Sequence, residues 1–206
     1  MPDADRPQIY LITPPAFDPA EFADRVAAVL DGAEVACLRL AMAGSDLDAI
    51  SRAADTLRGV AHARDVALVI ERHALLVPKL GLDGVHLADG ARSVRSLRKD
   101  LGADAIIGAA CGVTRHEGIG AAEAGADYVA FGPVGATGLG DGRIAEADLF
   151  DWWSEMIEVP VVAEGGLTAD LVARLGPVAD FLAIGAEIWN AQDPLGAMRA
   201  LLAPLG

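Results

Sequence analysis

The chain has 206 residues, of which 53% are hydrophobic and 22% are charged, and its formal net charge is −14. This length allows one domain with a sizeable core, and the composition excludes a disordered chain. The acidic balance argues against nucleic acid and anionic membranes as partners, and no apolar run approaches the ~20 residues of a membrane span. Because the polar, acidic N-terminus is unlike a secretory signal, we expect a single cytoplasmic domain over residues 1–206.

Short apolar runs rich in β-branched residues alternate with longer segments of helical periodicity. Most of the runs are apolar on both faces, which is typical of parallel strands buried beneath helices. The pattern predicts a compact α/β fold, a (β/α)8 barrel of the TIM type. In chain order, the predicted strands are Gln8–Thr13, Val35–Leu40, Val66–Glu71, Gly84–Leu87, Ala105–Ala110, Tyr128–Gly132, Val159–Ala163 and Phe181–Gly185. The helical segments between them are Asp18–Leu30, Ser45–Ala63, His73–Leu80, Ser93–Leu101, Thr114–Ala124, Ala145–Ile157, Thr168–Leu175 and Trp189–Leu202.

A weak internal repeat supports the barrel. Asp83, Asp127 and Asp180 each begin an even-numbered predicted strand in the same way. This position lies at the N-terminal end of the barrel, where an aspartate serves helix-to-strand turns.

Glycines follow the last two predicted strands, where the loops of such a barrel form the active site. Gly165 and Gly166 come after strand seven, and Gly185 comes after strand eight. Glycine lets the backbone approach an anion closely, and the helix that follows offers free N–H groups. We therefore predict a phosphate site here; the alternative is that the glycines only make tight turns.

Several charged residues also end predicted strands. Arg39 ends strand two among apolar neighbours, so its guanidinium is expected to face the barrel mouth and bind phosphate or pyrophosphate. Glu71 and Arg72 are adjacent, so side-chain alternation lets only one of them face the mouth. His86, on strand four, is either a catalytic acid–base group or a hydrogen-bonded core residue. Asp89 either binds a metal ion or caps the next helix.

The loop after strand six, from Gly132 to Arg143, contains several glycines around Thr137. So much glycine in one loop predicts a lid that closes over a ligand. A merely flexible connection is the alternative.

The motifs resemble a known family. From about residue 8 to residue 200, the chain is similar to the thiamine phosphate synthase and thiazole tautomerase-like superfamily. The motifs that carry the resemblance are Gln8-Ile-Tyr-Leu-Ile-Thr13, Leu38-Arg39-Leu40, Asp83-Gly-Val-His86-Leu87, Gly125-Ala-Asp-Tyr-Val-Ala-Phe-Gly132-Pro133, Pro160-Val-Val-Ala-Glu-Gly165-Gly166 and Ile184-Gly185.

The resemblance implies a (β/α)8 transferase of thiamine biosynthesis. It would join hydroxymethylpyrimidine pyrophosphate to thiazole phosphate, with Mg²⁺, and release pyrophosphate. Arg39 and Arg72 would hold the pyrophosphate, and the cluster of Gly165, Gly166 and Gly185 the thiazole phosphate. Further substrate-binding positions fall on Thr137, Ala110 and Glu164.

The metal and pyrophosphate motifs are altered. Ala41 stands at the lysine position of the strand-two motif, and Glu71-Arg72 replaces an Asn-Asp pair. Ala88-Asp89-Gly90-Ala91 replaces Gly-Gln-x-Asp, so Asp89 is the candidate Mg²⁺ ligand, and Ala110 stands at a serine position.

Three functions remain open from the sequence. The first is a divergent synthase that acts on a small phosphorylated heterocycle, with a homodimer as a possible assembly. The second is a non-catalytic phosphate-binding or regulatory protein. The third is an isomerase of a phosphorylated metabolite, with His86 or Glu71 as the acid–base group.

Overall fold

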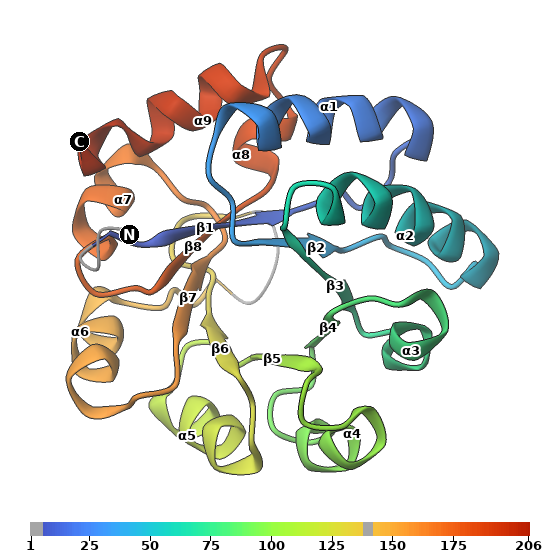
Figure 1. Ribbon diagram of the computed structural model, residues 1–206. Coiled ribbons are helices and arrows are strands. Elements are labelled where there is room, and N and C mark those ends of the chain that lie inside the picture. Colours follow the sequence, from blue (N-terminus) through green and yellow to red (C-terminus); the bar gives the residue numbers. More distant parts are fainter. Residues whose placement is uncertain (1–5, 138–141) are drawn as a thin grey trace.

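The chain folds into a closed barrel of eight parallel strands, which confirms the predicted (β/α)8 architecture. The structure is a computed structural model and describes residues 6–137 and 142–206. The strands follow one another around the barrel in sequence order, and β8 pairs with β1 to close it. Figure 1 shows the strands at the centre, with the helices arranged around them.

The elements lie close to the predicted ranges. The strands are β1 Gln8–Ile12, β2 Cys37–Leu40, β3 Ala67–Glu71, β4 Gly84–Leu87, β5 Ile106–Ala110, β6 Tyr128–Phe131, β7 Val161–Glu164 and β8 Phe181–Ile184. The helices are α1 Pro19–Gly32, α2 Leu47–His62, α3 Val77–Leu80, α4 Val94–Leu101, α5 Arg115–Ala124, α6 Ala147–Met156, α7 Ala169–Leu175, α8 Ala186–Trp189 and α9 Pro194–Leu202. Two 3₁₀ turns, Ala74–Leu76 and Ala203–Leu205, complete the described elements. Within the described ranges, every helix is too short or too polar to cross a membrane.

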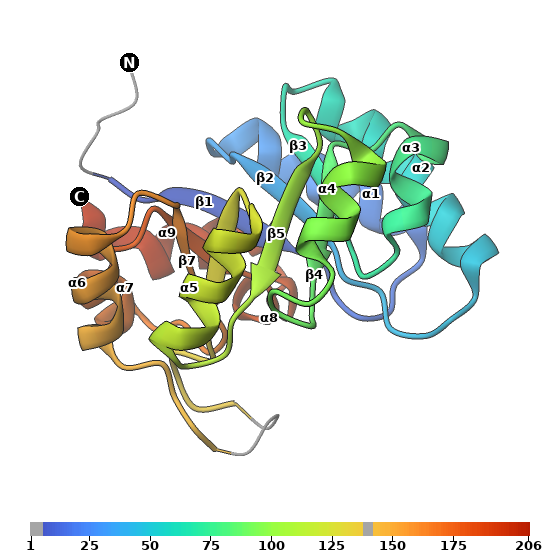
Figure 2. The same ribbon diagram turned by 90° about the horizontal axis from the view of Figure 1, so that it is seen from below.

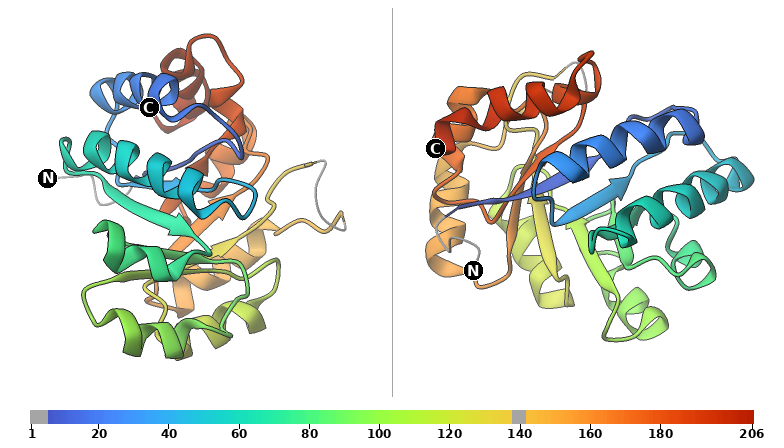
Figure 3. Two further views of the ribbon diagram at one scale, coloured as in Figure 1. Left: turned by 90° about the vertical axis from the view of Figure 1, so that its right-hand side faces the viewer. Right: turned by 45° about the horizontal axis from the view of Figure 1, so that its top comes forward.

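The last predicted helix, Trp189–Leu202, is wrong as a single element. It is divided into α8 and α9, because Asp193 caps a new helix by accepting the Gly196 N–H at 2.9 Å. Pro194 occupies the first position of α9, where its missing N–H costs nothing. The division lets α9 lie beside α1, so that the last helix meets the first (Figure 3).

The interior of the barrel is small and distinct from the larger core between strands and helices. Its buried members are Tyr10, Cys37, Val69, Tyr128, Ala130, Val162 and Ala183. The two tyrosine hydroxyls are 2.7 Å apart and hydrogen-bonded. The Tyr128 ring fits only because Gly108 faces it: a Cβ added at Gly108 would lie 1.9 Å from the ring.

The repeated aspartates serve the backbone, in agreement with the interpretation from the sequence. Asp83, Asp127 and Asp180 each accept an N–H of the preceding strand, from Leu68, Ile107 and Val161, at 2.6, 2.6 and 2.7 Å respectively. These bonds tie the starts of β4, β6 and β8 to the strands that precede them. They lie at the N-terminal end of the barrel, away from residues 132–137, which follow β6 at the other end (Figure 2).

Candidate active site

A charged layer covers the apolar barrel interior at the C-terminal ends of the strands. Arg39, at 5% exposure, points into this mouth from β2. Its Nη2 donates to Oε2 of Glu164 on β7 at 2.9 Å, and its Nε lies 3.7 Å from Oε2 of Glu71 on β3. Its guanidinium carbon also lies 5.6 Å from the centre of the Tyr10 ring. Arg39 therefore ties three strands together at the mouth.

Arg39 remains a cation, and part of its guanidinium is not used in hydrogen bonds to described residues. Burial alone would lower its pKa, but the nearby carboxylates of Glu164 and Glu71 raise the pKa overall. Among the described residues, its buried Nε and Nη1 have no hydrogen-bond partner. Leaving a buried donor unsatisfied costs about 1–3 kcal/mol, so an anion bound at the mouth would be stabilised by these two atoms.

Glu71 and Arg72 do not obey the alternation expected from the sequence, and that prediction is wrong. β3 ends at Glu71, and Arg72 adopts a left-handed backbone with φ of 68°. The turn brings Nη2 of Arg72 to 2.9 Å from Oε1 of Glu71. Glu71 thus lies between two arginines, the buried Arg39 and the largely exposed Arg72.

His86 belongs to a hydrogen-bonded chain inside the barrel. Its ring is buried on β4, and its Nδ1 lies 3.0 Å from the hydroxyl of Tyr128, which in turn contacts Tyr10. Burial, together with the positive charges of Arg39 and Arg72, holds the pKa of His86 well below its usual value. The imidazole is therefore neutral, and its partners are those of a hydrogen-bonded core residue.

The depressed pKa of His86 predicts a loss of stability in acid. Because the folded protein resists protonation of His86, the unfolded chain binds more protons below its usual pKa of about 6.5. The free energy of unfolding should therefore fall as the pH drops from 7 to 5, by up to about 1.4 kcal/mol per pH unit for this one group. Urea unfolding of the wild type and His86→Gln at several pH values measures the difference. Equal pH slopes for the two proteins would contradict the buried, neutral state.

The predicted phosphate site forms a cup of backbone N–H groups. Gly165 and Gly166 adopt φ of 85° and 76°, which only glycine reaches without strain. The N–H groups of Gly166, Leu167 and Gly185 converge, and all three donate to the carboxylate of Glu187. We call these three N–H groups the phosphate cup. Sequence reasoning missed Glu187, although its place two residues after Gly185 was a usable signal.

Close backbone packing is a second reason for the glycines. A Cβ added at Gly166 would lie 2.9 Å from the backbone of Gly135, and one added at Gly135 would lie 2.0 Å from the carbonyl oxygen of Gly166. The loops after β6 and β7 therefore touch beside the cup. Thr137 is exposed near Gly165, while Gly138 and Gly140 of the predicted lid lie outside the described residues.

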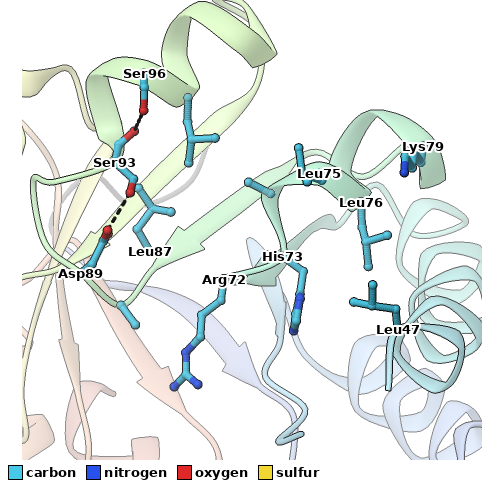
Figure 4. A pocket seen from close by; sticks show the side chains of 13 residues that line it. Leu47, Arg72, His73, Leu75, Leu76, Lys79, Leu87, Asp89, Ser93 and Ser96 are labelled. Atoms are coloured by element: carbon cyan, nitrogen blue, oxygen red, sulfur yellow. Dashed lines mark hydrogen bonds between the residues drawn. The ribbon is translucent and has the colours of Figure 1, made fainter. Parts of the chain in front are cut away.

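Two cavities meet at this end of the barrel. One, of about 550 Å³, is bounded by small residues at the ends of β5 and β6, including Ala110 and Gly132, and by Glu164. The other, of about 640 Å³, lies between α2, α3 and α4, where Arg72 points away from Leu75 and Lys79 (Figure 4). Ala88 and Asp89 line both cavities.

Among the described residues, the carboxylates nearest the predicted Mg²⁺ site already have partners of their own. Asp89 accepts a 2.6 Å hydrogen bond from Ser93, the N-cap residue of α4, and Glu71 is neutralised by two arginines. Across residues 6–137 and 142–206, no group of three or more His, Cys, Asp and Glu is placed to hold a metal.

Comparison with known proteins shows which family the chain belongs to. Residues 9–188 match the family described as thiamine monophosphate synthase. Thiamine-phosphate synthase of Rhodospirillum centenum is 44% identical over 198 residues, covering 94% of each chain. That of Hyphomonas neptunium is 38% identical over 203 residues, covering 95% of this chain and 92% of the relative. The chain belongs to the thiamine monophosphate synthase family.

The fold of this thiamine monophosphate synthase family member also matches a solved structure. Thiamine phosphate pyrophosphorylase from Pyrococcus furiosus superposes with a TM-score of 0.80 at 22% identity, over 98% of this chain and 99% of that one. At that identity the likeness shows the barrel alone. The family match and the sequence relatives confirm the resemblance read from the sequence.

Proposed function

We propose that the chain is a thiamine phosphate synthase, which joins hydroxymethylpyrimidine pyrophosphate to thiazole phosphate and releases pyrophosphate. The observation that carries this proposal is the buried Arg39, whose Nε and Nη1 lack hydrogen-bond partners within the described residues. Names of relatives at 44% and 38% identity support the same reaction.

The reaction requires a carbon–oxygen bond to break and a carbon–nitrogen bond to form. The pyrophosphate leaves the pyrimidine methylene carbon with the bonding electron pair, and the thiazole nitrogen supplies the pair for the new bond. Arg39 and Arg72 would bind the departing pyrophosphate, because fixed cations stabilise charge as it develops. A buried arginine is already oriented and loses little entropy on binding.

Two further features would position the other substrate. The phosphate cup would hold the thiazole phosphate, and the cavity bounded by Ala110, Gly132 and Glu164 has room for a heterocycle. Glu164 already faces Arg39 at 2.9 Å, so the carboxylate lies beside the predicted position of the leaving group. That negative charge would favour the cation that forms when the pyrimidine pyrophosphate ionises.

The test is direct turnover. The purified protein is incubated with both half-molecules, with Mg²⁺, Mn²⁺ or a chelator, and thiamine phosphate and pyrophosphate are quantified by chromatography. We expect equimolar products. Absence of thiamine phosphate under all three conditions would refute the synthase. Thermal stabilisation by thiazole phosphate without turnover would then favour a binding protein.

A further inference from the structure

Glu187 occupies the place predicted for the substrate's phosphate. Its Oε1 accepts the N–H groups of Gly166 at 3.1 Å and Leu167 at 3.2 Å, and its Oε2 accepts that of Gly185 at 2.8 Å. The three donors come from two loops, one after β7 and one after β8. A single side chain thus satisfies the whole cup.

The same donors cannot serve Glu187 and a phosphate at once. A backbone N–H has one hydrogen to donate, and two anions at this distance repel each other. Glu187 is only partly buried and lies in the first turn of α8, so its carboxylate can reach solvent by side-chain rotation. The cup therefore has two states, closed by Glu187 or open to a ligand.

We propose that Glu187 is an internal competitor for the phosphate cup, which a ligand's phosphate must displace. This inference rests on the proposed function, because it takes the cup as the site of a phosphate. When only a fraction of the protein is open, the apparent dissociation constant rises by the inverse of that fraction. Glu187 thus sets specificity. It weakens the binding of free phosphate, whereas a phosphorylated heterocycle gains further binding energy from the neighbouring cavity and displaces the carboxylate.

Calorimetric titration with inorganic phosphate tests the competition in the folded protein. Glu187→Ala should bind phosphate roughly tenfold or more tightly than the wild type, about the worth of one charge-assisted hydrogen bond. Asp170→Asn is the matched control, because Asp170 is an exposed acid in the first turn of neighbouring α7. The control should bind phosphate as the wild type does.

Three results would overturn the proposal. They are equal phosphate affinity in the wild type and Glu187→Ala, no binding to either, or an equal gain in Asp170→Asn, which would mean a general charge effect. If Glu187→Ala does not fold, as judged by circular dichroism, Glu187→Gln replaces it. That variant keeps the size of the side chain and loses its charge, so it should still bind phosphate more tightly than the wild type, and equal affinity would refute competition.

The outcome is separable from that of the synthase assay. Tighter phosphate binding by Glu187→Ala, together with no thiamine phosphate from the wild type, would refute the proposed reaction and leave the competition standing. Turnover by the wild type with unchanged phosphate affinity in Glu187→Ala would support the proposed reaction and refute the competition by Glu187.

Discussion

Replacing Arg39 with methionine should reduce thiamine phosphate formation at least about 100-fold, the usual effect of removing a preorganised charge donor. It should also lower the free energy of unfolding by about 3 kcal/mol, because breaking a buried ion pair leaves its partners uncompensated. Those partners are Glu164, at 2.9 Å, and Glu71, at 3.7 Å. Product assays and urea unfolding measure the two effects separately.

A second substitution distinguishes the two roles of Arg39. Adding Glu164→Gln to Arg39→Met removes the unpaired carboxylate, so it should restore part of the stability and none of the activity. Arg52→Ala, an exposed arginine on α2, is the control and should change neither. Full activity in folded Arg39→Met would contradict the role of Arg39 in holding pyrophosphate.

Gly108→Ala should strongly destabilise the interior of the barrel. The added Cβ would lie 1.9 Å from Cζ and 2.3 Å from the hydroxyl oxygen of Tyr128. Because the ring is buried and its hydroxyl contacts both Tyr10 and His86, moving the ring aside would break these hydrogen bonds. We expect a loss of about 3 kcal/mol, at the upper end of usual overpacking penalties.

Thermal or urea unfolding of Gly108→Ala measures this loss, and Gly59→Ala is its control. Gly59 lies within α2, where a Cβ would meet no described atom within 4 Å. Replacing a helical glycine with alanine should raise stability by roughly 0.5–1 kcal/mol. A Gly108→Ala protein as stable as the wild type would mean that the interior of the barrel yields more readily than its packing indicates.

The part of the site that could be predicted depends on local chemistry. The turn at Gly165 and Gly166 could be predicted from the sequence, because glycine adopts positive φ without strain whatever its neighbours are. The direction of the Arg39 side chain could also be predicted, because an arginine near the end of an apolar strand reaches solvent only at the barrel mouth. The contact between Arg72 and Glu71 could not be predicted, because it depends on the left-handed backbone of Arg72 just beyond β3.

The sequence by itself determined the barrel, its strands and the end of the barrel at which an anion site is predicted. These follow from hydrophobic periodicity and glycine placement, which act over a few residues. Only the tertiary structure decided which charges meet. Arg39 pairs with Glu164, 125 residues away, and Glu187 reaches Gly166 across 21 residues. Such contacts depend on barrel closure and strand register, which bring the ends of distant strands together and which no local pattern encodes.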